Sequence, residues 1–188
     1  MRPSSILIIL GIDPSSTSTG FGLLEVGIPR SRFRYTHCGC IRPPAKMLFE
    51  DRLVYFYEQM REIVVKWDPD EVAVESTFFG KDARAASKLD HARGVLVLAA
   101  RQSNKPILHY TPAQVKKAIA GSGQATKERV QLMITRMLGL KEMPKPLDAS
   151  DALAIALCHI HQLRLRPIKG VSKRKPEVEA LLQRMTSR

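Results

Sequence analysis

The stretch ILIILGIDPSSTSTGFGLL, residues 6–24, decides how the rest of the chain is interpreted. An apolar run ends in a single carboxylate, Asp13, and a hydroxyl-rich turn leads into a second apolar run. The turn could cradle a nucleotide phosphate, with Ser15, Ser16 and Thr17 as donors. Alternatively, the two runs could form a β-hairpin whose lone carboxylate holds a metal ion. The two interpretations lead to different classes of protein.

Hydrophobic patterning around this stretch predicts an α/β fold with a mixed five-stranded sheet flanked by helices. Residues 6–12 are a continuous Ile/Leu run, which is typical of a strand buried on both faces. Residues 19–27 and 33–41 alternate as further strands do, and their short links favour an antiparallel meander. The later elements are expected as strands at 71–77 and 107–110 and helices at about 47–67, 82–102, from Thr111-Pro112, at 127–138, and from Pro146 or Asp148 to Arg164.

The composition favours a nucleic-acid partner. The 188 residues include 30 Lys and Arg against 18 Asp and Glu, a formal net charge of +12. This excess attracts a polyanion, with nucleic acid as the first expectation and an anionic membrane surface as the second. The length suits one domain, assigned to residues 1–163. A basic stretch broken by prolines and a glycine follows, so residues 164–188 are predicted to be a solvated tail.

Three cysteines are too few for a disulfide framework in a chain of this size, which favours a reducing compartment. No run reaches the roughly 18 apolar residues of a membrane span. The apolar stretch from Ile6 to Leu10, which Asp13 soon follows, is also shorter than the about 7 to 15 apolar residues of a secretory signal. We therefore expect a soluble, cytoplasmic protein with no membrane partner.

Four carboxylates occupy positions that suit one shared site. Asp13 ends the first predicted strand and Glu75 ends the segment EVAVE of a later one, and strand ends are where open α/β sheets place their ligands. Asp148 and Asp151 stand three residues apart at the start of a predicted helix, so they point to one face. Taken alone, Asp148 also suits a helix N-cap, Asp151 a partner of the helix dipole, and Asp13 an Asx turn. Taken together, the four carboxylates predict a metal site.

Four converging acidic side chains repel one another, and their pKa values are raised unless divalent cations neutralise them. Hard oxygen ligands select Mg²⁺ or Mn²⁺. Two such ions about 3.5 to 4 Å apart can activate water and stabilise the leaving oxygen in phosphodiester cleavage. An acidic centre within a strongly basic protein therefore predicts a metal-dependent nuclease.

Five segments in register carry a family resemblance. They are ILGIDP at 9–14, VAVES followed by FF at 72–79, KLDHARGVLVLAA at 88–100, QVKKAIAGSG at 114–123 and DASDALAIALCH at 148–159. In this order they resemble the RuvC family of Holliday-junction resolvases, the crossover junction endodeoxyribonucleases, over about residues 6–163. The resemblance implies a ribonuclease H-like fold, a homodimer, and two-metal hydrolysis that nicks two strands of a four-way DNA junction symmetrically in recombination and repair. It also implies branch-migration partners of the RuvA and RuvB type.

The resemblance assigns catalytic roles residue by residue. It implies that two Mg²⁺ ions, for which Mn²⁺ can substitute, are held by Asp13, Glu75, Asp148 and Asp151. Phe78 matches an aromatic residue that stacks on a base near the scissile site, where stacking is typically worth about 1 to 3 kcal/mol. Core packing is the alternative role for Phe78.

Basic residues complete the set of candidates. Lys116 and Lys127 match positions that the family places beside the active site. Lys127 follows a Gly-rich turn at a helix start, so it could reach a phosphate together with backbone N–H groups. Arg84, Lys88 and Arg93, on the helix after the second carboxylate, are candidate contacts to the DNA backbone. The alternative for each lysine is a solvated surface position.

One position departs from the family pattern. The family usually has glycine where Ser15 stands, directly after GIDP, so this turn must tolerate a side chain. The departure bears on how closely DNA approaches the turn.

Three other interpretations remain. GIDPSSTSTG also resembles the first phosphate loop of sugar kinases and actin-like ATPases, although those enzymes need two such domains and a second phosphate loop. A non-catalytic protein that binds branched DNA could keep the same fold. Cysteines and histidines near residues 38 and 159 could suggest zinc, but His159 and His161 diverge on a helix. We expect core or surface roles for them.

Overall fold

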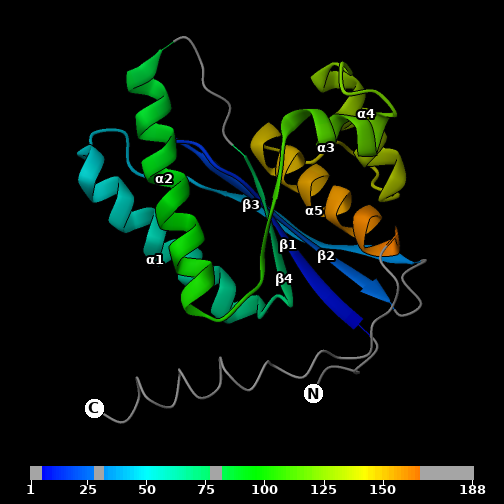
Figure 1. Cartoon of the computed structure of the whole chain (residues 1–188), viewed down its shortest axis with the longest axis horizontal. Helices are drawn as coiled ribbons and strands as arrows, with labels where there is room; N and C mark the ends of the chain where they lie inside the picture. The colour runs from blue at the N-terminus through cyan, green and yellow to red at the C-terminus, as the bar shows by residue number, and fades with distance from the viewer. Residues whose placement is uncertain (1–5, 28–31, 77–81, 166–188) are drawn as a thin grey trace.

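Five strands form one mixed sheet in the order β3-β2-β1-β4-β5. The computed structural model describes residues 6–27, 32–76 and 82–165. The strands are β1 (Ile6–Asp13), β2 (Thr19–Gly27), β3 (Phe33–Ile41), β4 (Glu71–Glu75) and β5 (Ile107–Tyr110). The helices are α1 (Phe49–Trp67), α2 (Ala83–Gln102), α3 (Pro112–Ala120), α4 (Lys127–Met137) and α5 (Leu147–Leu165). In Figure 1, α1 and α2 lie to the left of the sheet and α3, α4 and α5 to its right.

The side-chain alternation of the central strands divides the core into two halves, because successive residues of a strand point to opposite faces. On β1, Ile8, Leu10 and Ile12 pack with α1 and α2. Ile9 of the same strand and Ala73 of β4 face the other way and pack with α3, α4 and α5. Strand β1 is thus buried on both faces, as its unbroken apolar run predicts.

Strand pairing confirms the predicted topology. β1 pairs antiparallel with β2 and β2 with β3, whereas β1 and β4 are parallel, as are β4 and β5. Thr111 caps α3 through a capping box, with Pro112 at the first position, as expected. Helix α1 begins at Phe49, two residues later than predicted, and Leu48 directly before it is exposed.

Helix α5 lies directly against the strands. A Cβ atom added to Gly11 of β1 would stand 2.1 Å from the carbonyl oxygen of Ala152, and one added to Gly20 of β2 would stand 2.0 Å from that of Asp148. Both distances are far below van der Waals contact. Glycines at these two positions therefore allow the first turns of α5 to reach the sheet.

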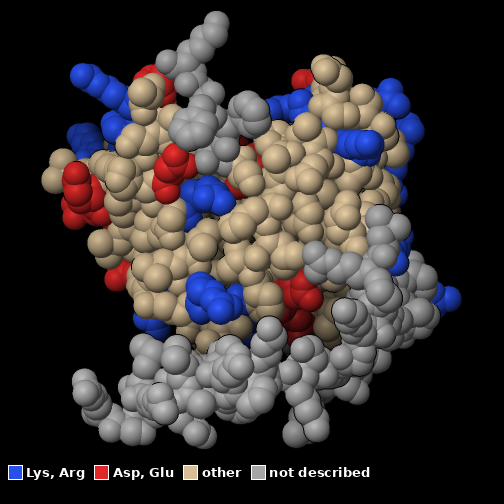
Figure 2. Space-filling model, viewed as in Figure 1, with Lys and Arg blue, Asp and Glu red and all other residues tan. Residues whose placement is uncertain are grey.

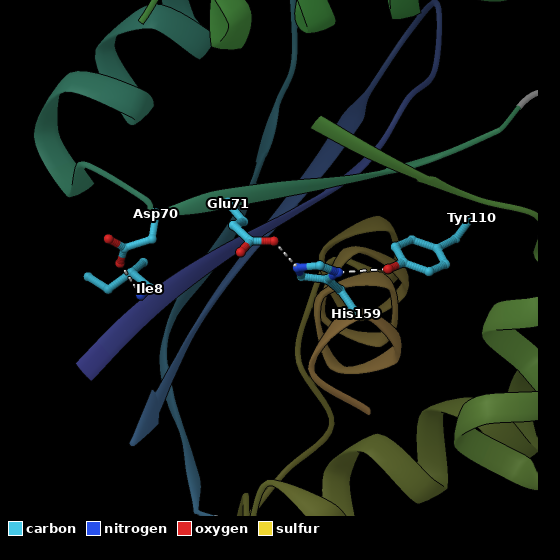
Figure 3. A network of polar contacts seen from close by, with 5 residues as sticks. All are labelled: Ile8, Asp70, Glu71, Tyr110 and His159. Carbon is cyan, nitrogen blue, oxygen red and sulfur yellow. Dashed lines mark hydrogen bonds and ion pairs between the residues drawn. The ribbon is translucent and has the colours of Figure 1, made fainter. Parts of the chain in front are cut away.

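A buried polar network holds the other half of α5 (Figure 3). His159 is fully buried, with Nδ1 2.7 Å from the hydroxyl of Tyr110 on β5 and Nε2 2.9 Å from a carboxylate oxygen of Glu71 on β4. His161 lies with Nδ1 3.2 Å from the carbonyl oxygen of Ala118. These contacts within the protein favour the core roles predicted for both histidines over zinc binding. None of the three cysteines forms a disulfide.

Two predictions concern residues that the structure does not describe, and they stay predictions. Phe78 and the tail from residue 166 lie outside the described residues. The described part of the tail is only the end of α5, which runs to Leu165. Among the described helices, none has the length and apolar character needed to cross a membrane.

The glycine contacts predict a position-specific loss of stability. Gly20→Ala should lower the free energy of unfolding by about 1 to 3 kcal/mol, because the new methyl group must displace the backbone of α5. Urea unfolding followed by circular dichroism measures this change.

Gly94→Ala is the matched control. Gly94 lies within α2 with nothing inside 4 Å of an added Cβ, so alanine should stabilise the helix by about 0.5 to 1 kcal/mol. Equal stability of the Gly20→Ala variant and the unsubstituted protein would contradict the close packing of α5.

Candidate metal centre

Asp13 and Glu75 end neighbouring parallel strands on the same face of the sheet. Ile12 of β1 pairs with Val74 of β4, so the next residue of each strand is one of these two carboxylates. Alternation places Asp13 on the face of Ile9, and Glu75 on the face of Ala73, which is the side of α5. Strand register thus brings together two residues 62 positions apart.

Helix α5 supplies the next acidic group. With Gly11 and Gly20 beneath its first turns, Asp151 lines the same pocket as Asp13 and Glu75. This pocket has a volume of about 250 Å³ and lies among β1, β4, α3, α4 and α5. Its apolar walls are formed by Pro112, Val115, Val130 and Ala154. In Figure 1 the ends of β1 and β4 lie near the top of the view, between α2 and the pair α3 and α4.

The carboxylates of the pocket disfavour one another's ionised form. Burial raises the pKa of Asp13 to about 8, and the charges of Glu75 and Asp151 add to this effect, followed by that of Asp148. Burial raises the pKa of Glu75 to about 7, with a further contribution from Asp151. The pKa of Asp151 is also raised by burial, although Lys127 opposes the shift. A cation in the pocket would relieve this repulsion.

The donor chemistry of this cluster suits a hard divalent cation, since its oxygen ligands are carboxylates. In the described ranges, no three His, Cys, Asp or Glu side chains stand in position to hold a metal ion together. The ammonium of Lys127 lies 3.6 Å from Asp151 Oδ2. To hold one ion together, the carboxylates would therefore have to turn toward it.

Asp148 differs from the other three carboxylates in its surroundings. It lies in the first turn of α5 and accepts a 2.7 Å hydrogen bond from the hydroxyl of Ser18. Its charge acts on Asp13 and Asp151, although it does not line the pocket. Asp148 is therefore near the centre but is oriented by the β1–β2 turn. The hydroxyl-rich sequence showed that a donor was available there, but periodicity could not indicate that Ser18 was the one.

The hydroxyls of the β1–β2 turn mostly serve the turn itself. Ser15 Oγ lies 3.3 Å from the amide nitrogen of Thr17 and 3.5 Å from that of Ser18. Thr19 Oγ1 lies 3.3 Å from the amide nitrogen of Ser15 and 3.2 Å from its carbonyl oxygen. The turn thus accommodates the Ser15 side chain by folding it inward. These internal bonds favour the hairpin interpretation over a phosphate cradle.

Two lysines stand beside the carboxylates. Lys116 of α3 and Lys127, the first residue of α4, both line the pocket. The hydroxyl of Thr126 caps α4, and the side chain of Lys127 is 74% exposed, so a ligand can reach it from outside the pocket. Figure 2 shows Lys and Arg side chains gathered over α3 and α4 at the upper right of the view.

The three basic residues of α2 differ in their surroundings. Arg84 is exposed in the first turn. Lys88 is also exposed, with its ammonium 5.7 Å from the centre of the Phe49 ring of α1. Arg93 is half-buried, and its guanidinium contacts the backbone of Glu75 and the ring of His109. The sequence placed all three on one helix but could not separate the inward residue from the outward ones.

Comparison with known proteins gives a consistent result. The family model for the crossover junction endodeoxyribonuclease RuvC matches residues 9–159. A relative of that name from Pelotomaculum thermopropionicum is 44% identical over 155 residues, which cover 82% of this chain and 93% of the relative. Another, from Desulfitobacterium hafniense, is 42% identical over 159 residues, with 85% of this chain and 95% of the relative covered.

The structural comparison agrees. The structure of T. thermophilus RuvC in complex with Holliday junction substrate matches with a TM-score of 0.78 at 36% identity, over 85% of this chain and 96% of that one. This match confirms the predicted ribonuclease H-like fold. The chain belongs to the RuvC family of crossover junction endodeoxyribonucleases.

Proposed function

We propose that this protein is a Holliday-junction resolvase, an endonuclease that nicks two strands of a four-way DNA junction symmetrically in recombination and repair. The observation that most supports this activity is the pocket where carboxylates from β1, β4 and α5 meet two lysines. The relatives are crossover junction endodeoxyribonucleases by name, and the T. thermophilus protein is in complex with a Holliday junction substrate. A basic protein with an acidic pocket suits a polyanionic substrate.

The proposed cofactor is a pair of Mg²⁺ ions, which Mn²⁺ can replace. The residues that would hold them are Asp13, Glu75, Asp148 and Asp151. When bound, such ions activate water and stabilise the charge on the leaving oxygen. The raised pKa values of Asp13 and Glu75 support this proposal, because a divalent cation favours the ionised form that burial disfavours.

The remaining residues of the pocket would position the DNA. Lys116 and Lys127 would bind phosphate oxygens at the rim, where Lys127 can act with the first amides of α4. Val115 and Val130 would limit water around the reacting phosphate. Arg84 and Lys88 remain candidate contacts to the DNA backbone, and Phe78 remains a candidate for stacking on a base.

Symmetric cutting requires two centres, so we propose that the protein acts as a homodimer. We also propose that it works with branch-migration proteins of the RuvA and RuvB type, which supply and move the junction. Since the substrate would be chromosomal DNA, we propose that it acts in the cytoplasm.

The carboxylate set predicts a separation of cleavage from binding. Asp13→Asn or Asp148→Asn should lower Mg²⁺- or Mn²⁺-dependent nicking of a synthetic four-way junction by more than about 10²-fold, because even outer partners of metal ligands cost 10- to 100-fold. Gel-shift measurements in EDTA should show junction binding unchanged.

Linear duplex DNA serves as the substrate control, and Asp51→Asn as the protein control. Asp51 is an exposed residue in the first turn of α1, and its substitution should leave nicking unchanged. Continued nicking by the Asp13→Asn variant would argue against the proposed reaction.

The raised pKa values predict a pH-dependent response to metal. The unfolded state ionises Asp13 near its ordinary pKa of 3.8, whereas the folded state holds its proton to about pH 8. The free energy of unfolding without metal should therefore fall between about pH 4 and pH 8, while stabilisation by Mn²⁺ should grow over the same window. Thermal unfolding with and without Mn²⁺ measures both trends.

Asp13→Asn isolates this contribution from that of other titrating groups. The variant should lose less stability as the pH rises and should gain less from Mn²⁺. If the free energy of unfolding changed with pH equally in the two proteins, the pKa of Asp13 would not be raised in the folded state.

The basic rim predicts a strongly salt-dependent interaction with DNA. Affinity for a four-way junction should fall by about 10³- to 10⁵-fold between 50 and 200 mM salt if six to ten phosphates are contacted. Lys127→Gln should reduce the slope of log K against log salt by about one. Lys66→Gln, on α1 beside Trp67, should leave the slope unchanged. A flat salt response would contradict phosphate binding.

A further inference from the structure

Arg93 lies in the middle of α2 with its guanidinium turned toward the sheet. Its Nε donates a 3.2 Å hydrogen bond to the backbone carbonyl of Glu75, and an Nη donates a 2.9 Å bond to Nδ1 of His109. Arg93 is half-buried, whereas Arg84 and Lys88 on the same helix are exposed. Its side chain is therefore engaged within the protein, which separates it from its two basic neighbours.

The carbonyl of Glu75 stands where β4 leaves the sheet. Pairing with β1 ends one residue earlier, at Val74. On the other side, the amide of Ser76 donates to the carbonyl of Tyr110 at 2.7 Å. A half-buried carbonyl at a strand end needs a donor from elsewhere. The charged guanidinium provides one, and such a bond is about twice as strong as a neutral one.

His109 gives the guanidinium a second attachment. Arginine can only donate, so Nδ1 of His109 must accept and the ring proton of the neutral imidazole must lie on Nε2. Burial and the charge of Arg93 lower the pKa of His109, which keeps the ring neutral and able to accept. Through these two bonds, Arg93 joins α2 to β4 and β5.

We propose that Arg93 is a positioning residue that holds the end of β4 so that the carboxylate of Glu75 stays in the metal pocket. This inference rests on the proposed metal-dependent function. The carboxylate needs such support because the charges of Asp13 and Asp151 oppose it there. A strand end without this attachment would let Glu75 move outward and lower the affinity of the pocket for a divalent cation.

The test compares Arg93→Met, Arg93→Lys and His109→Phe with the unsubstituted full chain. Mn²⁺ binding to the DNA-free protein is measured by electron paramagnetic resonance. Arg93→Met should bind Mn²⁺ about 10- to 100-fold more weakly, as is typical when the partner of a metal ligand is removed. Arg93→Lys and His109→Phe should lose less, because each retains part of the attachment.

Junction nicking and junction binding complete the comparison. Arg93→Met should need correspondingly more Mn²⁺ for half-maximal nicking and should recover its rate at saturating Mn²⁺. In EDTA, its affinity for the junction should stay within about twofold of that of the unsubstituted protein. The slope of log K against log salt should also be the same for the two proteins. Recovery at high Mn²⁺ distinguishes positioning from general damage to the fold.

Arg101→Met is the matched control. Arg101 lies in the last turn of α2, where its side chain lies 3.4 Å from the carbonyl oxygen of Lys105, and its loss should change neither Mn²⁺ binding nor nicking. Should Arg93→Met fail to fold, His109→Phe carries the test, since it removes one of the two bonds only.

Two results would overturn the proposal. One is unchanged Mn²⁺ binding in Arg93→Met and His109→Phe. The other is weakened junction binding with a salt slope lower by about one, which would make Arg93 a phosphate contact. If the unsubstituted protein and Arg101→Met both fail to nick junctions, the proposed function fails instead, and the Mn²⁺ titration still tests Arg93.

Discussion

The contact between α5 and the two strands beneath it is the constraint on which the rest of the structure depends. Gly11 and Gly20 leave no room for a side chain between sheet and helix. The helix can therefore bring Asp148 and Asp151 to the strand end that carries Asp13. A larger residue at either glycine would move α5 away from the sheet. It would thereby separate Asp148 and Asp151 from Asp13 and also disturb the core.

Helix α5 meets β4 at both ends of that strand. Asp151 and His159 are eight residues apart, about 12 Å along a helix, and Glu75 and Glu71 are four residues apart, about 13 Å along a strand. The matching lengths allow α5 to meet Glu75 at the pocket and Glu71 through His159 at the other end. A buried polar network distant from the pocket thereby sets the register of the helix that carries the acidic residues.

The acidic residues of the pocket lower the stability of the metal-free fold when they are ionised. Carboxylates that are buried close together disfavour ionisation, and among the described residues of the pocket Lys127 and Lys116 offset this effect. A cluster of this kind is typical of a functional site rather than of a group that stabilises the fold. Helix α2 contributes in two ways, since Arg84 and Lys88 face outward while Arg93 attaches the strand end that bears Glu75.

The sequence by itself determined the strands and most helix bounds, and it predicted the four acidic residues of the metal centre, because strand and helix periodicity, turn residues and family segments are all local patterns. It also indicated Lys116 and Lys127 as neighbours of the centre. Only the tertiary structure decided that Ser18 orients Asp148, that His159 joins Glu71 to Tyr110, and that Arg93 turns inward. These contacts depend on how distant elements approach one another, and periodicity along one segment carries no information about that approach.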